Sequence, residues 1–137
     1  MIVADTGAVI ALIDADDQYH QAMVELFEAD PGAWVLPWAI LPEVDYLLQT
    51  HVSAQAELTF VQDIAGGAYS VEWGATIDAH RANALCSKYA KLGIGLVDGV
   101  VIAVAERLGA TTIATLDNRH FGAIKIGGSP KLFPRDA

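Results

Sequence analysis

The chain has 137 residues, which is room for one domain with its own hydrophobic core and little else. Hydrophobic residues make up 53% of it, and this excludes an intrinsically disordered or fibrous protein. Seventeen Asp and Glu against eight Lys and Arg give a formal charge of -9, which argues against coating nucleic acid by bulk electrostatics. Every Lys and Arg lies at or after Arg81, so the first 80 residues are strongly acidic. This distribution leaves room for a basic partner, or for cations held by clustered carboxylates.

The cysteine content and the N-terminal residues indicate the compartment. A single cysteine, Cys86, cannot form an internal disulfide or a cysteine metal cluster, and a reducing cytosol is its natural setting. Asp5 and Asp14 interrupt the N-terminal apolar stretch, which therefore does not read as a signal peptide. No window approaches the roughly 20 apolar residues of a membrane span. We expect one cytoplasmic domain over residues 1–137, without a membrane partner.

In chain order, the sequence predicts short strands that alternate with helices. Strands are predicted at 1–4, 33–36, 69–73 and 111–116, with one more strand or an irregular tail in 124–126 and 131–133. Helices are predicted at 7–13, 17–28, 42–51, 53–64, 76–90 and 98–108. This alternation predicts a three-layer α/β/α domain with a short, mainly parallel sheet. In such a sheet, ligands bind beyond the carboxyl ends of the strands.

Four acidic residues fall on that predicted edge. Asp5 ends the first strand, Asp117 ends the strand at 111–116, Asp98 begins an apolar helix, and Glu43 lies in the first turn of another. Each has an ordinary explanation, because Asp and Glu are favoured at helix N-termini. Capping does not, however, require all four elements to present carboxylates at the same edge.

Four carboxylates at one edge predict a site for a hard cation. They would repel one another and raise each other's pKa unless a cation compensates. Mg²⁺ or Mn²⁺ takes oxygen ligands, and either ion can activate a water and neutralise a phosphodiester. Zinc is disfavoured because the four histidines show no paired ligand spacing and there is no cysteine pair.

Six short segments form an ordered set across the chain. They are Asp5-Thr6, His20 with Ala22, Glu43-Val44, Leu96-Val97-Asp98, Thr115-Leu116-Asp117 and Arg119-His120-Phe121. In order and spacing, the set resembles the PIN-domain ribonucleases, in particular the VapC-type toxins of bacterial type II toxin–antitoxin pairs. The resemblance covers essentially the whole chain, although no single segment is specific.

The resemblance implies both an activity and a partner. The implied activity is that of an Mg²⁺- or Mn²⁺-dependent endoribonuclease, which a cognate VapB-type antitoxin holds inactive. Asp5 and Asp98 would be the principal metal ligands, and Glu43 and Asp117 would complete the site directly or through water. The expected substrate is structured or loop RNA such as tRNA or rRNA, and the expected assembly is a homodimer.

Four neighbours of the acids qualify this assignment. Thr6 would orient the first acid or a water. Thr115 would do the same for the last acid, or is simply a β-branched strand residue. The chain departs from the family pattern at Gly99, which is expected to loosen the start of its helix, and at Asn118, which offers a neutral oxygen.

Basic residues near the last acid are candidates for RNA contacts. Arg119 and His120 follow that acid, where a cationic side chain can meet a phosphate, or they lie exposed on a capping turn. Arg81 shares a helical face with Lys88 and Lys91. That face either tracks an RNA backbone or is simply solvated.

Aromatic and apolar residues of the second strand and third helix offer a surface for dimerisation or antitoxin docking. They are Trp34, Trp38, Tyr46 and Leu47. Plain core packing accounts for them equally well.

Two other classes of function remain open. A catalytically degenerate PIN-like module would only sequester a partner, and the presence of all four acids argues against it. A phosphoryl-handling domain would also have an acidic magnesium pocket. A haloacid-type phosphatase, however, needs an Asp where Gly7 stands, and a receiver domain needs a Lys where Asn118-Arg119 stands.

Overall fold

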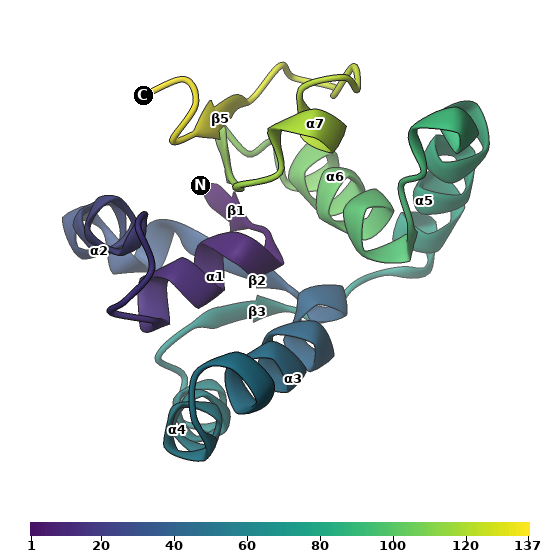
Figure 1. Ribbon diagram of the computed structural model, residues 1–137. Coiled ribbons are helices and arrows are strands. Elements are labelled where there is room, and N and C mark those ends of the chain that lie inside the picture. The colour runs from purple at the N-terminus through teal and green to yellow at the C-terminus, as the bar shows by residue number, and fades with distance from the viewer.

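The computed structural model describes residues 1–137, which build an α/β fold around a five-stranded sheet (Figure 1). The strands are β1 (Ile2–Ala4), β2 (Trp34–Pro37), β3 (Ser70–Glu72), β4 (Thr112–Ala114) and β5 (Lys131–Phe133). Their order is β3-β2-β1-β4-β5, and all four neighbouring pairs are parallel. The predicted α/β fold with a mainly parallel sheet is confirmed, and the sheet is parallel throughout.

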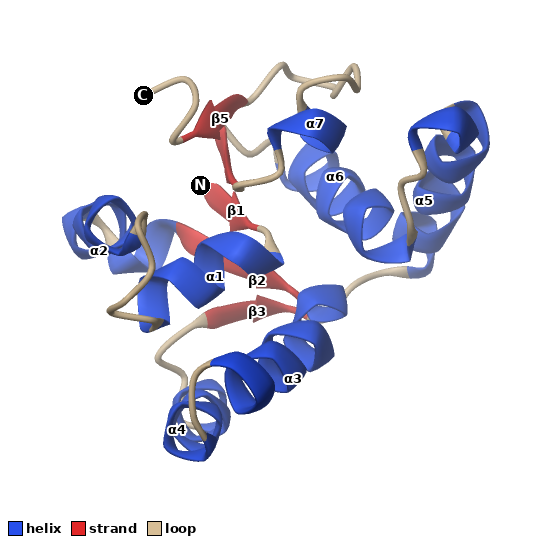
Figure 2. Cartoon of the chain, in the orientation of Figure 1, coloured by secondary structure: helices blue, strands red, loops and turns tan.

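The central strands are buried on both faces. Val3 and Ala4 of β1 point to opposite faces, and both have no exposed surface. The same holds for Ile113 and Ala114 of β4. Helices must therefore cover both faces of the sheet, and Figure 2 shows the strands grouped between helices on either side.

Seven α-helices and three short 3-10 helices complete the fold. The α-helices are α1 (Thr6–Ile13), α2 (His20–Ala29), α3 (Leu41–His51), α4 (Ala54–Ala65), α5 (Thr76–Lys88), α6 (Leu96–Leu108) and α7 (Asn118–Phe121). The 3-10 helices are η1 (Pro31–Ala33), η2 (Trp38–Ile40) and η3 (Ala90–Leu92). None of the helices is both long and apolar enough to span a bilayer.

Two predicted helix starts are wrong. The second helix begins at His20, because Asp17 closes the preceding turn by accepting the Tyr19 N–H at 2.8 Å. Helix α6 begins at Leu96, so Asp98 is its third residue. The cap position belongs to Gly95, so Asp98 does not occupy a capping position.

The aromatic surface suggested by the sequence is divided between core and solvent. Trp34 has no exposed surface, and Trp38 is only partly exposed against the core. Tyr46 of α3 is 63% exposed, whereas Leu47 lines a cavity described below. Of the four residues, Tyr46 is therefore the one free to contact a partner.

Gly99 allows a close approach between α5 and α6. A β-carbon at this position would lie 2.9 Å from the Ala82 Cβ and 3.1 Å from its Cα. The sequence led us to expect a loosened helix start, but the contact shows that the glycine serves close packing. Because α6 carries Asp98, this packing also fixes the position of that carboxylate.

We predict that Gly99→Ala destabilises the protein by about 1–2 kcal/mol, because overpacking against Ala82 outweighs the better helix propensity of alanine. Urea unfolding of the purified variant measures the change in midpoint. In the Ala82→Gly/Gly99→Ala double variant, the Gly99→Ala cost should shrink without disappearing, because the Cβ contact is lost while the Cα of residue 82 remains 3.1 Å away. A cost that is the same in both backgrounds would show that this contact does not limit the packing.

Candidate active site

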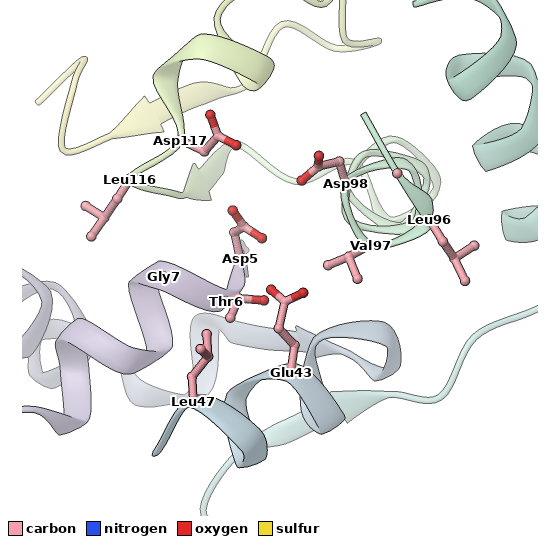
Figure 3. Close-up of a pocket in the computed structure, with 11 residues that line it drawn as sticks. Asp5, Thr6, Gly7, Glu43, Leu47, Leu96, Val97, Asp98, Leu116 and Asp117 are labelled. Carbon is pink, nitrogen blue, oxygen red and sulfur yellow. The ribbon is translucent and has the colours of Figure 1, made fainter. Parts of the chain in front are cut away.

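A cavity of about 670 Å³ opens at the carboxyl ends of β1 and β4. Its lining consists of Asp5, Thr6, Gly7, Glu43, Leu47, Gly95, Leu96, Val97, Asp98, Leu116 and Asp117. Figure 3 shows that the four carboxylates converge from the starts of α1, α3, α6 and α7. The structure thus brings together all four acids that the sequence analysis singled out.

Asp5 lies at the floor of the cavity and is only 6% exposed. It occupies the N-cap position of α1, yet its side chain makes no capping hydrogen bond. Its Oδ2 atom instead accepts the Thr115 hydroxyl at 2.9 Å. Helix capping therefore does not explain a carboxylate at this position.

Burial raises the pKa of Asp5 from its ordinary value of 3.8 to about 6. The neighbouring Thr6 backbone N–H and the hydrogen bond from the Thr115 hydroxyl oppose the shift, while the charges of Asp98 and Glu43 add to it. The net direction shows that the folded protein holds this negative charge at a cost. A bound cation would remove that cost.

Asp98 and Asp117 lie on either side of His120. The His120 Nδ1 atom is 3.2 Å from Asp98 Oδ2 and 2.9 Å from Asp117 Oδ2. Burial raises the pKa of Asp98, the nearby Asp117 charge raises it further, and His120 lowers it. The three side chains offer ligand atoms that all lie within 4.8 Å of one another.

Thr115 connects two of the acids. It follows β4 directly and is fully buried. Its hydroxyl donates to Asp5 and accepts the Asp117 N–H at 3.0 Å. Asp117 in turn caps α7, since its Oδ1 accepts the His120 N–H at 3.1 Å. A threonine that also fits the β-branched preference of a strand therefore fixes the geometry of the site.

Glu43 and Thr6 form the opposite wall of the cavity. Glu43 lies in the first turn of α3, and its side chain is exposed. Figure 3 shows the Thr6 side chain directed toward the Glu43 carboxylate. The Thr6 hydroxyl is buried and has no hydrogen-bond partner. A buried, unpaired hydroxyl at a polar cavity is suited to bind a water or the water shell of an ion.

The donors in this cavity fit a hard divalent cation. Four carboxylates and the free Thr6 hydroxyl are oxygen ligands, which Mg²⁺ and Mn²⁺ prefer. No Lys or Arg is among the lining residues, so no basic side chain of the lining neutralises the acids. His120 adds a nitrogen that the sequence analysis did not include in the acidic cluster. Its spacing of three residues from Asp117 on a helix was the available signal.

The other predicted contact residues lie outside the cavity. Asn118 and Arg119 are exposed residues at the start of α7 and are not among the lining residues. Arg81 pairs with Glu106, with its Nε atom 2.7 Å from Oε1, and the structure does not bring it to the acids.

Comparisons with known proteins show the family and the fold of the chain. The model of the PIN domain family matches residues 2–126. The curated protein Ribonuclease VapC26 of Mycobacterium tuberculosis is 34% identical over 128 residues, covering 93% of this chain and 95% of that protein. The crystal structure of VapC20 from M. tuberculosis, a Sarcin-Ricin loop cleaving toxin, aligns with a TM-score of 0.77 at 20% identity, over 91% of this chain and 97% of that one.

Two complexes share the fold at lower identity. A toxin-antitoxin complex from Klebsiella pneumoniae aligns with a TM-score of 0.67 at 19% identity, covering 90% of this chain and 92% of that one. VapBC2 from Rickettsia felis, bound to a DNA fragment from its promoter, aligns with a TM-score of 0.68 at 17% identity. The alignment covers 96% of this chain and 97% of that one.

The family match and the acidic cavity define the class, and the chain belongs to the PIN-domain family. Within that family, the similarity to a VapC ribonuclease over nearly the full length of both chains confirms the predicted VapC-type resemblance.

We predict that Asp5→Asn stabilises the metal-free protein by about 1–3 kcal/mol at pH 7.5. The pKa of this carboxyl is higher in the folded state, about 6, than its ordinary value of 3.8. The contribution of this carboxyl to the free energy of unfolding is therefore fully present below pH 3.8 and is lost as the pH rises to about 6. Urea unfolding in EDTA should show a gain at pH 7.5 that shrinks by pH 4.

The exposed carboxylate of Asp16 provides the control, because Asp16→Asn should leave stability unchanged at both pH values. If Asp5→Asn lowers the stability at pH 7.5, then the Asp5 charge is not held at a cost.

Proposed function

We propose that this protein is a divalent-metal-dependent endoribonuclease toxin that hydrolyses RNA phosphodiesters. The observation that carries the proposal is the convergence of four carboxylates in one cavity whose lining contains no Lys or Arg. Similarity to Ribonuclease VapC26, which is 34% identical over nearly its full length, supports RNA cleavage. RNA is itself an anion, and a carboxylate cavity can accept a phosphodiester only through a cation.

Each acid has a role that follows from its position. Asp5, fixed by Thr115 at the floor, and Asp98, fixed by α6, are the principal ligands for Mg²⁺ or Mn²⁺. Glu43 and Asp117 complete the ligand set directly or through water. The bound ion supplies charge neutralisation at the phosphate and increased acidity of the attacking water. Oxygen donors suit both ions and do not discriminate between Mg²⁺ and Mn²⁺.

Other residues of the site position the acids and the water. Thr115 holds the orientation of Asp5, and His120 sets the separation of Asp98 and Asp117. The unpaired Thr6 hydroxyl is placed to hold a water at the cavity wall. Arg119, exposed on α7 next to this cluster, is placed to contact a neighbouring phosphate.

We propose further that a VapB-type antitoxin is the partner and that the active assembly is a homodimer. Solved complexes from K. pneumoniae and R. felis with the same fold support the antitoxin partner. Exposed apolar side chains of α3 and α4 (Tyr46, Leu58 and Val61) supply surface for a protein interface. Structured RNA such as tRNA or rRNA is the proposed substrate, and the Sarcin-Ricin loop cleaving activity of VapC20 supports that class.

We predict that the protein cleaves RNA with Mg²⁺ or Mn²⁺ and not in EDTA. Asp98→Asn should lower the rate of RNA cleavage at least about 100-fold, because it weakens binding of the divalent ion while the protein stays folded. Gel assays on a panel of tRNA and rRNA fragments measure the rate, and circular dichroism checks the fold.

Asp16→Asn, which alters an exposed carboxylate away from the cavity, is the matched control and should cleave like the wild type. Full activity in Asp98→Asn would contradict the assigned ligand. If wild-type protein binds an antitoxin but cuts no RNA in either metal, the chain is a degenerate module that only sequesters its partner.

A further inference from the structure

The basic side chains fall into two groups, those with an acidic partner and those without. Three arginines are paired: Arg81 with Glu106, Arg107 with Asp78 and Glu72, and Arg135 with Asp136. The remaining five form no ion pair, and they are Lys88, Lys91, Arg119, Lys125 and Lys131. In a protein of net charge -9, these five are the cations left for an anionic ligand.

Two of the unpaired lysines line a second cavity of about 670 Å³, which we call the lysine pocket. Its lining is residues 87–92, from the end of α5 through η3, together with Ala123. Lys88 and Lys91 are exposed, and no acidic residue lines the pocket. The pocket therefore has the opposite charge character to the acidic cavity.

Tyr89 organises this pocket. Its hydroxyl accepts the Lys125 N–H at 3.2 Å, which joins η3 to the segment that follows α7. The Lys88 Nζ atom lies 5.5 Å from the centre of the Tyr89 ring, a cation–π contact that holds the ammonium without neutralising it. A third unpaired lysine, Lys125, is thus attached to the same edge by its backbone.

Both walls of the lysine pocket are close in sequence to residues that line the acidic cavity. Leu92 is three residues from Gly95, where the lining of the acidic cavity resumes, a span of at most about 10 Å. Ala123 follows α7, a four-residue helix about 6 Å long, and α7 is capped by Asp117. A flexible polyanion that enters one cavity can therefore reach the other within a few residues of its own chain.

We infer that the lysine pocket binds the backbone of the RNA strand on one side of the scissile phosphate. This inference rests on the proposed function, because it assigns the pocket to the same substrate. Lys88 and Lys91 neutralise phosphates of the strand. The short chain separation from the acidic cavity favours RNA over an acidic peptide. The overall charge of -9 then coexists with RNA binding, because the cations that contact RNA are confined to one edge.

The test compares RNA binding by wild-type protein with that of the Lys88→Gln/Lys91→Gln double variant. Fluorescence anisotropy with a labelled single-stranded RNA, in EDTA to prevent cleavage, gives the binding constant over a range of salt concentrations. The slope of log K against log salt is negative, and each lost phosphate contact reduces its magnitude by about 0.7. The slope of the double variant should therefore be smaller in magnitude by about 1.4, and the variant should bind about tenfold more weakly at 0.1 M salt.

Lys131→Gln is the matched control, since Lys131 is also unpaired and exposed but lies on β5, outside the pocket. A slope for the double variant equal to that of Lys131→Gln would overturn the inference. So would competition by poly-glutamate that is stronger than competition by RNA.

Cleavage assays of the same proteins separate this inference from the proposed function. If the wild-type protein cleaves RNA, and the double variant binds and cleaves RNA as the wild type does, the pocket assignment fails and the nuclease assignment stands. If RNA binding depends on the lysines but no metal supports cleavage, the pocket assignment stands and the nuclease assignment fails.

Discussion

Four carboxylates share one cavity, and the folded chain holds them there against mutual repulsion and the loss of hydration. The raised pKa values of Asp5 and Asp98 express that cost. The hydrogen bond from the Thr115 hydroxyl to Asp5 and the His120 ring beside Asp98 reduce the cost without removing it. A structure under this constraint is suited to bind a cation, which offsets the cost and prepares the site for an anionic substrate.

The parallel sheet makes the convergence possible. Because β1 and β4 are adjacent and parallel, the residues that follow them emerge at the same edge. Asp5 and Thr115 are thereby brought into hydrogen-bond contact across 110 residues of sequence. The close packing at Gly99 then places α6, and with it Asp98, against this edge. The site depends on tertiary packing, which explains why no local segment of the sequence is specific by itself.

The strand–helix alternation and the four acids could be predicted from the sequence, because hydrophobic patterning and strand ends are local features. The hydrogen bond between Thr115 and Asp5 could not, since it joins distant strands whose pairing is fixed only by packing. The role of Gly99 depended on its contact with Ala82 for the same reason. The ion pair between Arg81 and Glu106 could not be predicted either, because Glu106 lies on another helix, 25 residues away in the sequence.

The most direct measurement is a crystal structure of the protein grown with Mn²⁺, using anomalous diffraction to locate the ion. We expect a manganese peak within the acidic cavity, in contact with the carboxylates of Asp5 and Asp98. We expect no such peak for Asp5→Asn/Asp98→Asn crystals grown in the same way. A cavity without manganese in the wild-type crystals, or an ion bound only elsewhere on the surface, would contradict the claim that these carboxylates form a cation site.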